Sequence, residues 1–146
     1  MNETEQFRIL KKYLEHKGYL IVINSIFIPN SEVAQLTFSV LTDNNIELKP
    51  AGSNAEVKER RNGFPVNWFD EWEENSFQVI DEWQYDYYLQ FTHEEWCGKI
   101  RSVSWMTNAS NHIKIKITNE LMKSLENLEE VLNVPHRFSV VVLRYV

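Results

Sequence analysis

Three segments of the chain carry apolar patterns typical of β-strands. Residues 19–28 form a near-continuous apolar run rich in β-branched side chains, the pattern of a strand covered on both faces. Residues 77–91 alternate, so that mostly apolar side chains fall on one side and indicate a long half-buried strand. Residues 138–146 form a third run rich in β-branched side chains. The pattern therefore predicts three main strands.

Apolar residues at helical spacing predict helices before and between these strands. A helix over residues 4–17 is followed by Gly18, where a left-handed C-cap is favourable. Ser31 is a typical N-cap for the next helix, which ends before the polar residues 43–45. A short helix over residues 65–74 then brings two tryptophans together four residues apart.

The next helix has the clearest beginning. Thr92 and Glu95 form a capping box, so we expect a helix that begins at His93. Gly98 lies inside it and costs about 1 kcal/mol relative to alanine, which is usually tolerated where another backbone must pack closely. We therefore expect a backbone element close to Gly98.

Towards the end of the chain the pattern changes twice. Residues 112–117 alternate like a short extended segment, and Thr118 is a candidate N-cap for a leucine-rich helix that Pro135 stops. Residues 45–64 show little periodicity and contain two glycines, one proline and three asparagines, so we expect a long irregular loop there.

Together these elements predict a single α/β domain over residues 1–146. A chain of 146 residues that is 43% hydrophobic is long enough for one core. We expect a small mixed sheet in which the strand at 138–146 lies antiparallel between the strands at 19–28 and 77–91. Helices pack around this sheet in the predicted fold.

The net charge and the cysteine content argue against several classes of protein. A formal net charge of -6 argues against a nucleic-acid binder, which normally has a basic face. No run approaches the roughly 18 apolar residues of a membrane span, and the first residues lack a signal-peptide pattern. The one cysteine, Cys97, excludes an internal disulfide framework. We therefore expect a cytoplasmic protein without membrane or nucleic-acid partners.

Metal and nucleophile chemistry have weak support. His93 and Cys97 are four residues apart and share a helix face, but no third ligand is evident. Cys97 lies a full turn inside its helix, away from the terminus that would stabilise a thiolate. We interpret this segment as a capped helix with an inert thiol and no metal, and His136 as structural rather than catalytic.

Two short motifs suggest a family. One is the segment Thr92–Arg101, T-H-E-E-W-C-G-K-I-R, and the other is Pro135-His136-Arg137 before the last strand. They resemble segments near the carboxyl end of bacterial class I S-adenosylmethionine-dependent methyltransferases that act on small molecules. In that family, arginine usually stands at the positions of Cys97 and Lys99. The resemblance extends to the order of elements over nearly the whole chain.

The resemblance implies the carboxyl-terminal, substrate-side half of a Rossmann-like methyltransferase fold. The family binds its cofactor with a glycine-rich turn, because only glycines let backbone amides approach the ligand. This chain has four glycines, and no two lie within ten residues of each other. The resemblance therefore implies a methyltransferase-related protein that binds no cofactor and does not methylate alone. It is then a truncated remnant, or the partner of a separate cofactor-binding chain.

Two other functions stay open. One is a small-molecule binding module, with an aromatic pocket beneath the loop at 45–64. The other is a structural or interaction protein without a ligand. Candidate substrate-binding residues are the aromatic residues of the long alternating strand and the polar and aromatic residues of the capped helix: Trp83, Tyr85, Tyr87, His93, Trp96 and Arg101.

Self-association is also expected. The strand at 19–28 has the apolar character of an interior strand and contains none of the charges or prolines that protect a natural sheet edge. If the preceding half of the fold is absent, that edge is uncovered. We therefore predict a homodimer that buries well over about 1,000 Å² in total and involves the helix at 4–17 or the strand after it.

Overall fold

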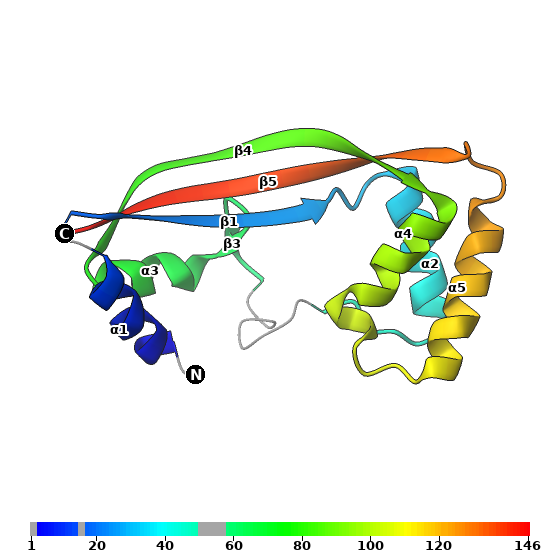
Figure 1. The fold of residues 1–146 in the computed structure, drawn as a ribbon, viewed down its shortest axis with the longest axis horizontal. Helices are drawn as coiled ribbons and strands as arrows, with labels where there is room; N and C mark the ends of the chain where they lie inside the picture. Colours follow the sequence, from blue (N-terminus) through cyan, green and yellow to red (C-terminus); the bar gives the residue numbers. More distant parts are fainter. Residues whose placement is uncertain (1–2, 15–16, 50–57) are drawn as a thin grey trace. The chain divides into compact units, whose positions relative to one another are not determined.

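The computed structural model describes residues 3–14, 17–49 and 58–146 (Figure 1). Its elements in chain order are α1 (Glu3–Tyr13), β1 (Tyr19–Phe27), α2 (Glu32–Asp43), β2 (Arg60–Arg61), β3 (Phe64–Pro65), α3 (Val66–Glu74), β4 (Phe77–Thr92), α4 (His93–Ser102), the 3₁₀ turn η1 (Ser104–Met106), α5 (Asn111–Leu125) and β5 (Val131–Tyr145). Within these ranges, no helix combines the length and the apolar character needed to cross a membrane.

The main sheet has the predicted order, with β5 between β1 and β4. Backbone N–H groups of Lys17 and Ile28 donate to the carbonyls of Tyr145 and Pro135, so β1 and β5 are antiparallel. Side-chain hydrogen bonds join β4 to β5 in the same sense: Gln84 to Ser139, Asp86 to Arg137, and Gln90 to Asn133. The predicted α/β class and the central position of the last strand are confirmed.

The chain forms two compact units. The first contains Met1–Ser25, Val57–Tyr85 and Phe138–Val146, and the second contains Ile26–Glu56 and Asp86–Arg137. Each unit has its own apolar cluster. That both belong to one domain stays a prediction.

The core of the first unit gathers around α3. Trp72 packs against Trp68 with ring centroids 6.2 Å apart, as the spacing of these residues predicts. Phe77 and Leu143 are buried beside them, and Leu20 of β1 packs against the same cluster. One face of the strands in this unit is therefore covered.

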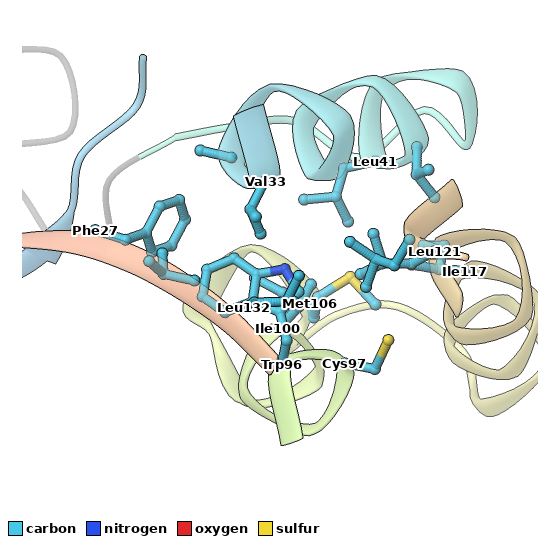
Figure 2. Close-up of a cluster of buried hydrophobic side chains, with 14 residues drawn as sticks. Phe27, Val33, Leu41, Trp96, Cys97, Ile100, Met106, Ile117, Leu121 and Leu132 are labelled. Atoms are coloured by element: carbon cyan, nitrogen blue, oxygen red, sulfur yellow. The ribbon is translucent and has the colours of Figure 1, made fainter. Parts of the chain in front are cut away.

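The core of the second unit lies among α2, α4 and α5 (Figure 2). Trp96 is fully buried there, and its Nε1 donates a hydrogen bond to Thr37 Oγ1 at 2.9 Å. Both bonds of the Thr92–Glu95 capping box are present, so α4 begins at His93 as predicted. The cap places Trp96 on the inner side of α4, where it contacts Phe27 and Phe91.

The prediction of an extended segment at 112–117 is wrong, because these residues are helical. The helix α5 is capped by Ser110, whose Oγ accepts from the N–H of Ile113. Thr118 is not a cap, since its Oγ1 donates to the carbonyl of Lys114 inside the helix. Ile117, Leu121 and Leu125 lie one turn apart and are all buried, and this burial outweighs the local alternation.

The predicted leucine-rich helix also ends early. Leu125 is the last residue of α5, and β5 begins at Val131 instead of 138. Leu132 is therefore a strand residue, buried in the core of the second unit. Pro135 lies inside β5 and accepts a hydrogen bond from the N–H of Ile28, so it does not break the pairing there.

Near the amino terminus, α1 ends at Tyr13 and not at Lys17. The left-handed residue is Lys17, with φ of 69°, rather than Gly18. Burial of β1 on both faces was also predicted, and this is wrong for the first unit. The strand alternates there, because only one of its faces meets the core of that unit.

Part of the segment predicted as an irregular loop is a hairpin. Arg60 pairs with Pro65 and Arg61 with Phe64 in the antiparallel strands β2 and β3. Asn62 and Gly63 join them with φ of 49° and 79°, the two left-handed residues of a type I′ turn. Residues 50–57 lie outside the described residues, so the prediction for them is not examined by the structure.

The expectation of a backbone element close to Gly98 is wrong. Among the described residues, a Cβ at this position would meet only Arg101 Nη2, at 3.6 Å, which is ordinary contact. Gly63 is the tightly packed glycine, since a Cβ there would lie 2.7 Å from Ser139 Oγ. Among the described residues, close packing therefore explains the glycine at position 63 and not the one at position 98.

Alanine at these two glycines should have opposite effects. Gly98→Ala should raise the free energy of unfolding by about 0.5–1 kcal/mol, because alanine loses less backbone entropy in a helix. Gly63→Ala should lower it by about 1–3 kcal/mol, because alanine is strained in the left-handed region and meets Ser139. Urea unfolding followed by tryptophan fluorescence measures both. A loss for Gly98→Ala as large as that for Gly63→Ala would show that α4 has a close neighbour after all.

Candidate functional site

The candidate residues from the sequence fall in both units. Trp83 and Tyr85 lie on β4 in the first unit and are largely exposed. Tyr87, on the same strand, belongs to the second unit, as do the three candidates on α4. The pockets described below, at Arg101, Phe69 and Ser31, include none of the aromatic residues that were expected to line a cavity. The aromatic pocket stays a prediction.

Three candidates on α4 have structural partners. Trp96 is a core residue, buried completely. The Nε2 atom of His93 lies 2.8 Å from the carbonyl of Glu129. Arg101 donates from Nη1 to Thr118 Oγ1 at 3.2 Å, which joins α4 to α5.

Shallow pockets lie on each unit. Arg101 borders one of about 320 Å³ in the second unit, lined also by Asn111, Lys114, Ile115, Thr118 and Asn119. Phe69 and Arg61 border another of about 440 Å³ in the first unit. A third, of about 270 Å³, lies beside Ser31 and Leu132 in the second unit. No unusual arrangement of titratable groups distinguishes any of them.

The most unusual polar contact in the described residues is between Lys99 and His136. Lys99 Nζ on α4 lies 2.8 Å from His136 Nε2 on β5. His136 is almost fully buried, and Lys99 is half-buried. Sequence reasoning assigned His136 a structural role and gave Lys99 none, so this pair was missed.

The hydrogen bonds fix the state of His136. Its Nδ1 lies 2.9 Å from the carbonyl oxygen of Val134, which can only accept, so Nδ1 carries a proton. Nε2 faces the ammonium of Lys99 and therefore accepts. Burial lowers the pKa of His136, and the charge of Lys99 lowers it further, against the opposing effect of the Val134 hydrogen bond. The imidazole is accordingly neutral near pH 7.

Aromatic rings surround the pair. The His136 ring stacks on Phe91 at 6.0 Å between centroids and lies 5.6 Å from the Tyr87 ring. Lys99 Nζ lies 5.2 Å from the Phe91 centroid and 6.0 Å from that of Trp96. Burial against these rings lowers the pKa of the Lys99 amine. The site thus holds the Lys99 ammonium and a neutral imidazole in apolar surroundings.

Cys97 lies on the same helix but plays no part in this site. It is buried, and burial raises the pKa of its thiol, against the smaller effect of the Arg101 charge. A raised pKa keeps the sulfur protonated and unreactive. Groups of three or more metal-ligating side chains are absent from the part of the chain that the structure describes.

The buried imidazole should make folding pH-dependent. The pKa of folded His136 lies below the ordinary value of 6.5, so as the pH falls through that value the unfolded chain takes up the proton first. Wild type should therefore lose unfolding free energy between about pH 7.5 and about pH 5.5. The charged group that faces this ring is Lys99 of α4, while Tyr87, Phe91 and Phe27 present rings to it.

Urea unfolding at the two pH values tests this. His136→Gln retains hydrogen-bonding groups without titrating, so its loss on acidification should be smaller than that of wild type. His112→Gln, at the exposed start of α5, is the matched control and should behave as wild type. Identical pH dependence in all three proteins would rule out a buried neutral His136.

Comparison with known proteins assigns no family. No protein-family model and no curated protein matches the sequence. Among solved structures, one described as "Crystal structure of MccD protein" is similar at 13% sequence identity, with a TM-score of 0.37. The similarity covers 100% of this chain and 55% of the MccD chain, so this chain spans little more than half the length of the MccD chain.

Proposed function

We propose that this chain is a methyltransferase-related interaction protein that neither binds S-adenosylmethionine nor methylates alone, and that assembles as a homodimer. The relation to methyltransferases rests on the motifs at Thr92–Arg101 and Pro135-His136-Arg137. The absence of a glycine-rich turn supports the loss of cofactor binding. The observation that carries the assembly is an apolar sheet face left uncovered in the first unit.

We call this surface the open face. It is formed by six large apolar or aromatic side chains that are each 38–63% exposed: Tyr19, Ile21 and Ile23 of β1, Trp83 and Tyr85 of β4, and Phe138 of β5. Their sequence neighbours Leu20 and Val22 pack into the core of the unit, and Ser139 is buried beside Gln84. Because side chains alternate along a strand, the six project on the opposite side.

A second copy of the chain is the occupant that this surface fits. Residues 19–27 contain no charged side chain, so two copies of β1 can meet across a two-fold axis without like charges facing each other. This strand is also an edge of the sheet, since it is hydrogen-bonded only to β5 among the described strands. Both the edge and the face favour an isologous contact.

The area is sufficient for a stable dimer. An aromatic side chain buries about 150–250 Å² when fully covered. The four on the open face are on average half exposed, so they offer about 400 Å² per copy before the two isoleucines are counted. Two copies together would bury about 1,000 Å², the lower limit of a specific interface.

A charge on the open face should separate the dimer. Wild type is expected to elute as a dimer in size-exclusion chromatography with light scattering, and Ile23→Lys as a monomer, because two buried ammonium groups would face each other without partners. Ile115→Lys is the matched control. Ile115 on α5 is 62% exposed, against 58% for Ile23, and its variant should stay dimeric. A monomeric wild type would contradict the homodimer.

Cofactor binding should be very weak. Calorimetric titration with S-adenosylmethionine and with S-adenosylhomocysteine is expected to give no dissociation constant tighter than roughly millimolar, because the amides and carboxylate that bind the cofactor in this family are missing. The protein should be titrated as its native oligomer. A micromolar constant would overturn the half-enzyme proposal and leave the dimer untouched.

A further inference from the structure

Lys99 has more hydrogen-bonding capacity than its surroundings use. An ammonium group has three N–H donors, and one of them reaches His136 Nε2. Within the described ranges, no carboxylate lies within ion-pair distance of this lysine and no other acceptor bonds to it. By contrast, Arg137 on the neighbouring strand has both a carboxylate partner and two hydrogen bonds to it.

A lysine in such surroundings is suited to react as a free amine. Apolar rings disfavour its charged form, and a nucleophilic lysine is activated by this desolvation. A neutral imidazole nitrogen at 2.8 Å is within the range at which a general base accepts a proton. The Val134 carbonyl holds the imidazole in the tautomer that presents its lone pair to the amine.

We propose that Lys99 is a carbonyl-binding amine, which forms an imine with an aldehyde that has a flat apolar or aromatic body, and that His136 is the base for this step. Lys99 and Tyr87 are both half-buried, so part of each side chain is open to solvent. The Phe91 ring stacks on His136 and supplies a flat surface beside Nζ, and the Tyr87 ring lies tilted against the imidazole. This assignment does not depend on the proposed dimer or on the proposed relation to methyltransferases.

The reaction balances without an external oxidant or reductant. The Lys99 ammonium gives one proton to His136 Nε2, and the Nζ lone pair then forms a bond to the carbonyl carbon while the C=O π bond breaks. The imidazolium returns its proton to the oxygen, and a second proton passes from Nζ to the same oxygen, which then leaves as water while the Nζ lone pair forms the second bond to carbon. The third proton of the original ammonium is released to solvent. The net products from ammonium and aldehyde are one imine, one water and one proton released to solvent.

Reductive trapping tests the proposal. The whole protein is treated with benzaldehyde and cyanoborohydride, and benzylated lysines are quantified by peptide mass spectrometry. Lys123, exposed on α5 in the same unit, is the reference inside the molecule. Lys99 should be modified at least about tenfold faster than Lys123. This is less than the rate acceleration of about 100-fold that a positioned general base can supply. A rate equal to or below that of Lys123 would overturn the proposal.

Variants of the base and the amine complete the test. His136→Gln should bring the Lys99 rate close to that of Lys123, and an unchanged ratio would show that the imidazole is not the base. Because His136 is buried, its variant is used only if its circular dichroism spectrum matches that of wild type. If it does not, the ratio of the Lys99 rate to the Lys123 rate in wild type still decides whether the Lys99 amine is activated. Lys99→Arg retains the positive charge but forms no imine, so it should lose the fast-labelled peptide and keep the Lys123 rate.

Discussion

Hydrogen bonding of β5 on both of its edges is the constraint on which the rest of the structure depends. It is the only strand of the main sheet, among those described, that has two neighbours. Its residues Leu132 and Val134 belong to the core of the second unit, and Val141 and Leu143 to that of the first. A strand that is paired on both sides and buried repeatedly along its length needs apolar side chains at most of its buried positions, and β5 has them at these four.

The fold was predictable where the sequence carries local signals. The three strands, the Ser31 cap and the Thr92–Glu95 capping box follow from residues close together in the chain. The Asn62-Gly63 pair is also a local hairpin signal, and it was missed because its strands have only two residues each. The start of α5 was missed because alternation over a few residues resembles both a strand and one side of a helix.

The site was less predictable. His136 and Lys99 are 37 residues apart, and only the packing of α4 against β5 brings them together. Each residue lies in one of the two motifs of the methyltransferase resemblance, but neither motif indicates a contact between them. The exposure of one side of β1 was also hard to predict from the sequence. An apolar run looks identical whether the element that covers it belongs to the same chain or to another.

Lys99 differs chemically from arginine, which is usual at this position in the methyltransferase family that the two motifs resemble. A guanidinium stays protonated in proteins, so it can bind an anion but cannot attack a carbonyl. A lysine amine in apolar surroundings can do so. Lysine instead of arginine at position 99 therefore changes the chemistry available in α4, and the capping box and Trp96 are in place beside it.

The burial of Cys97 makes the sulfur a reporter of breathing motions. It is the only cysteine in the chain, and it packs between α4 and the rest of the core in the second unit (Figure 2). A thiol reagent in solution can reach it only when that core opens. The rate of thiol modification under native conditions therefore measures how often the second unit opens, without a signal from the first.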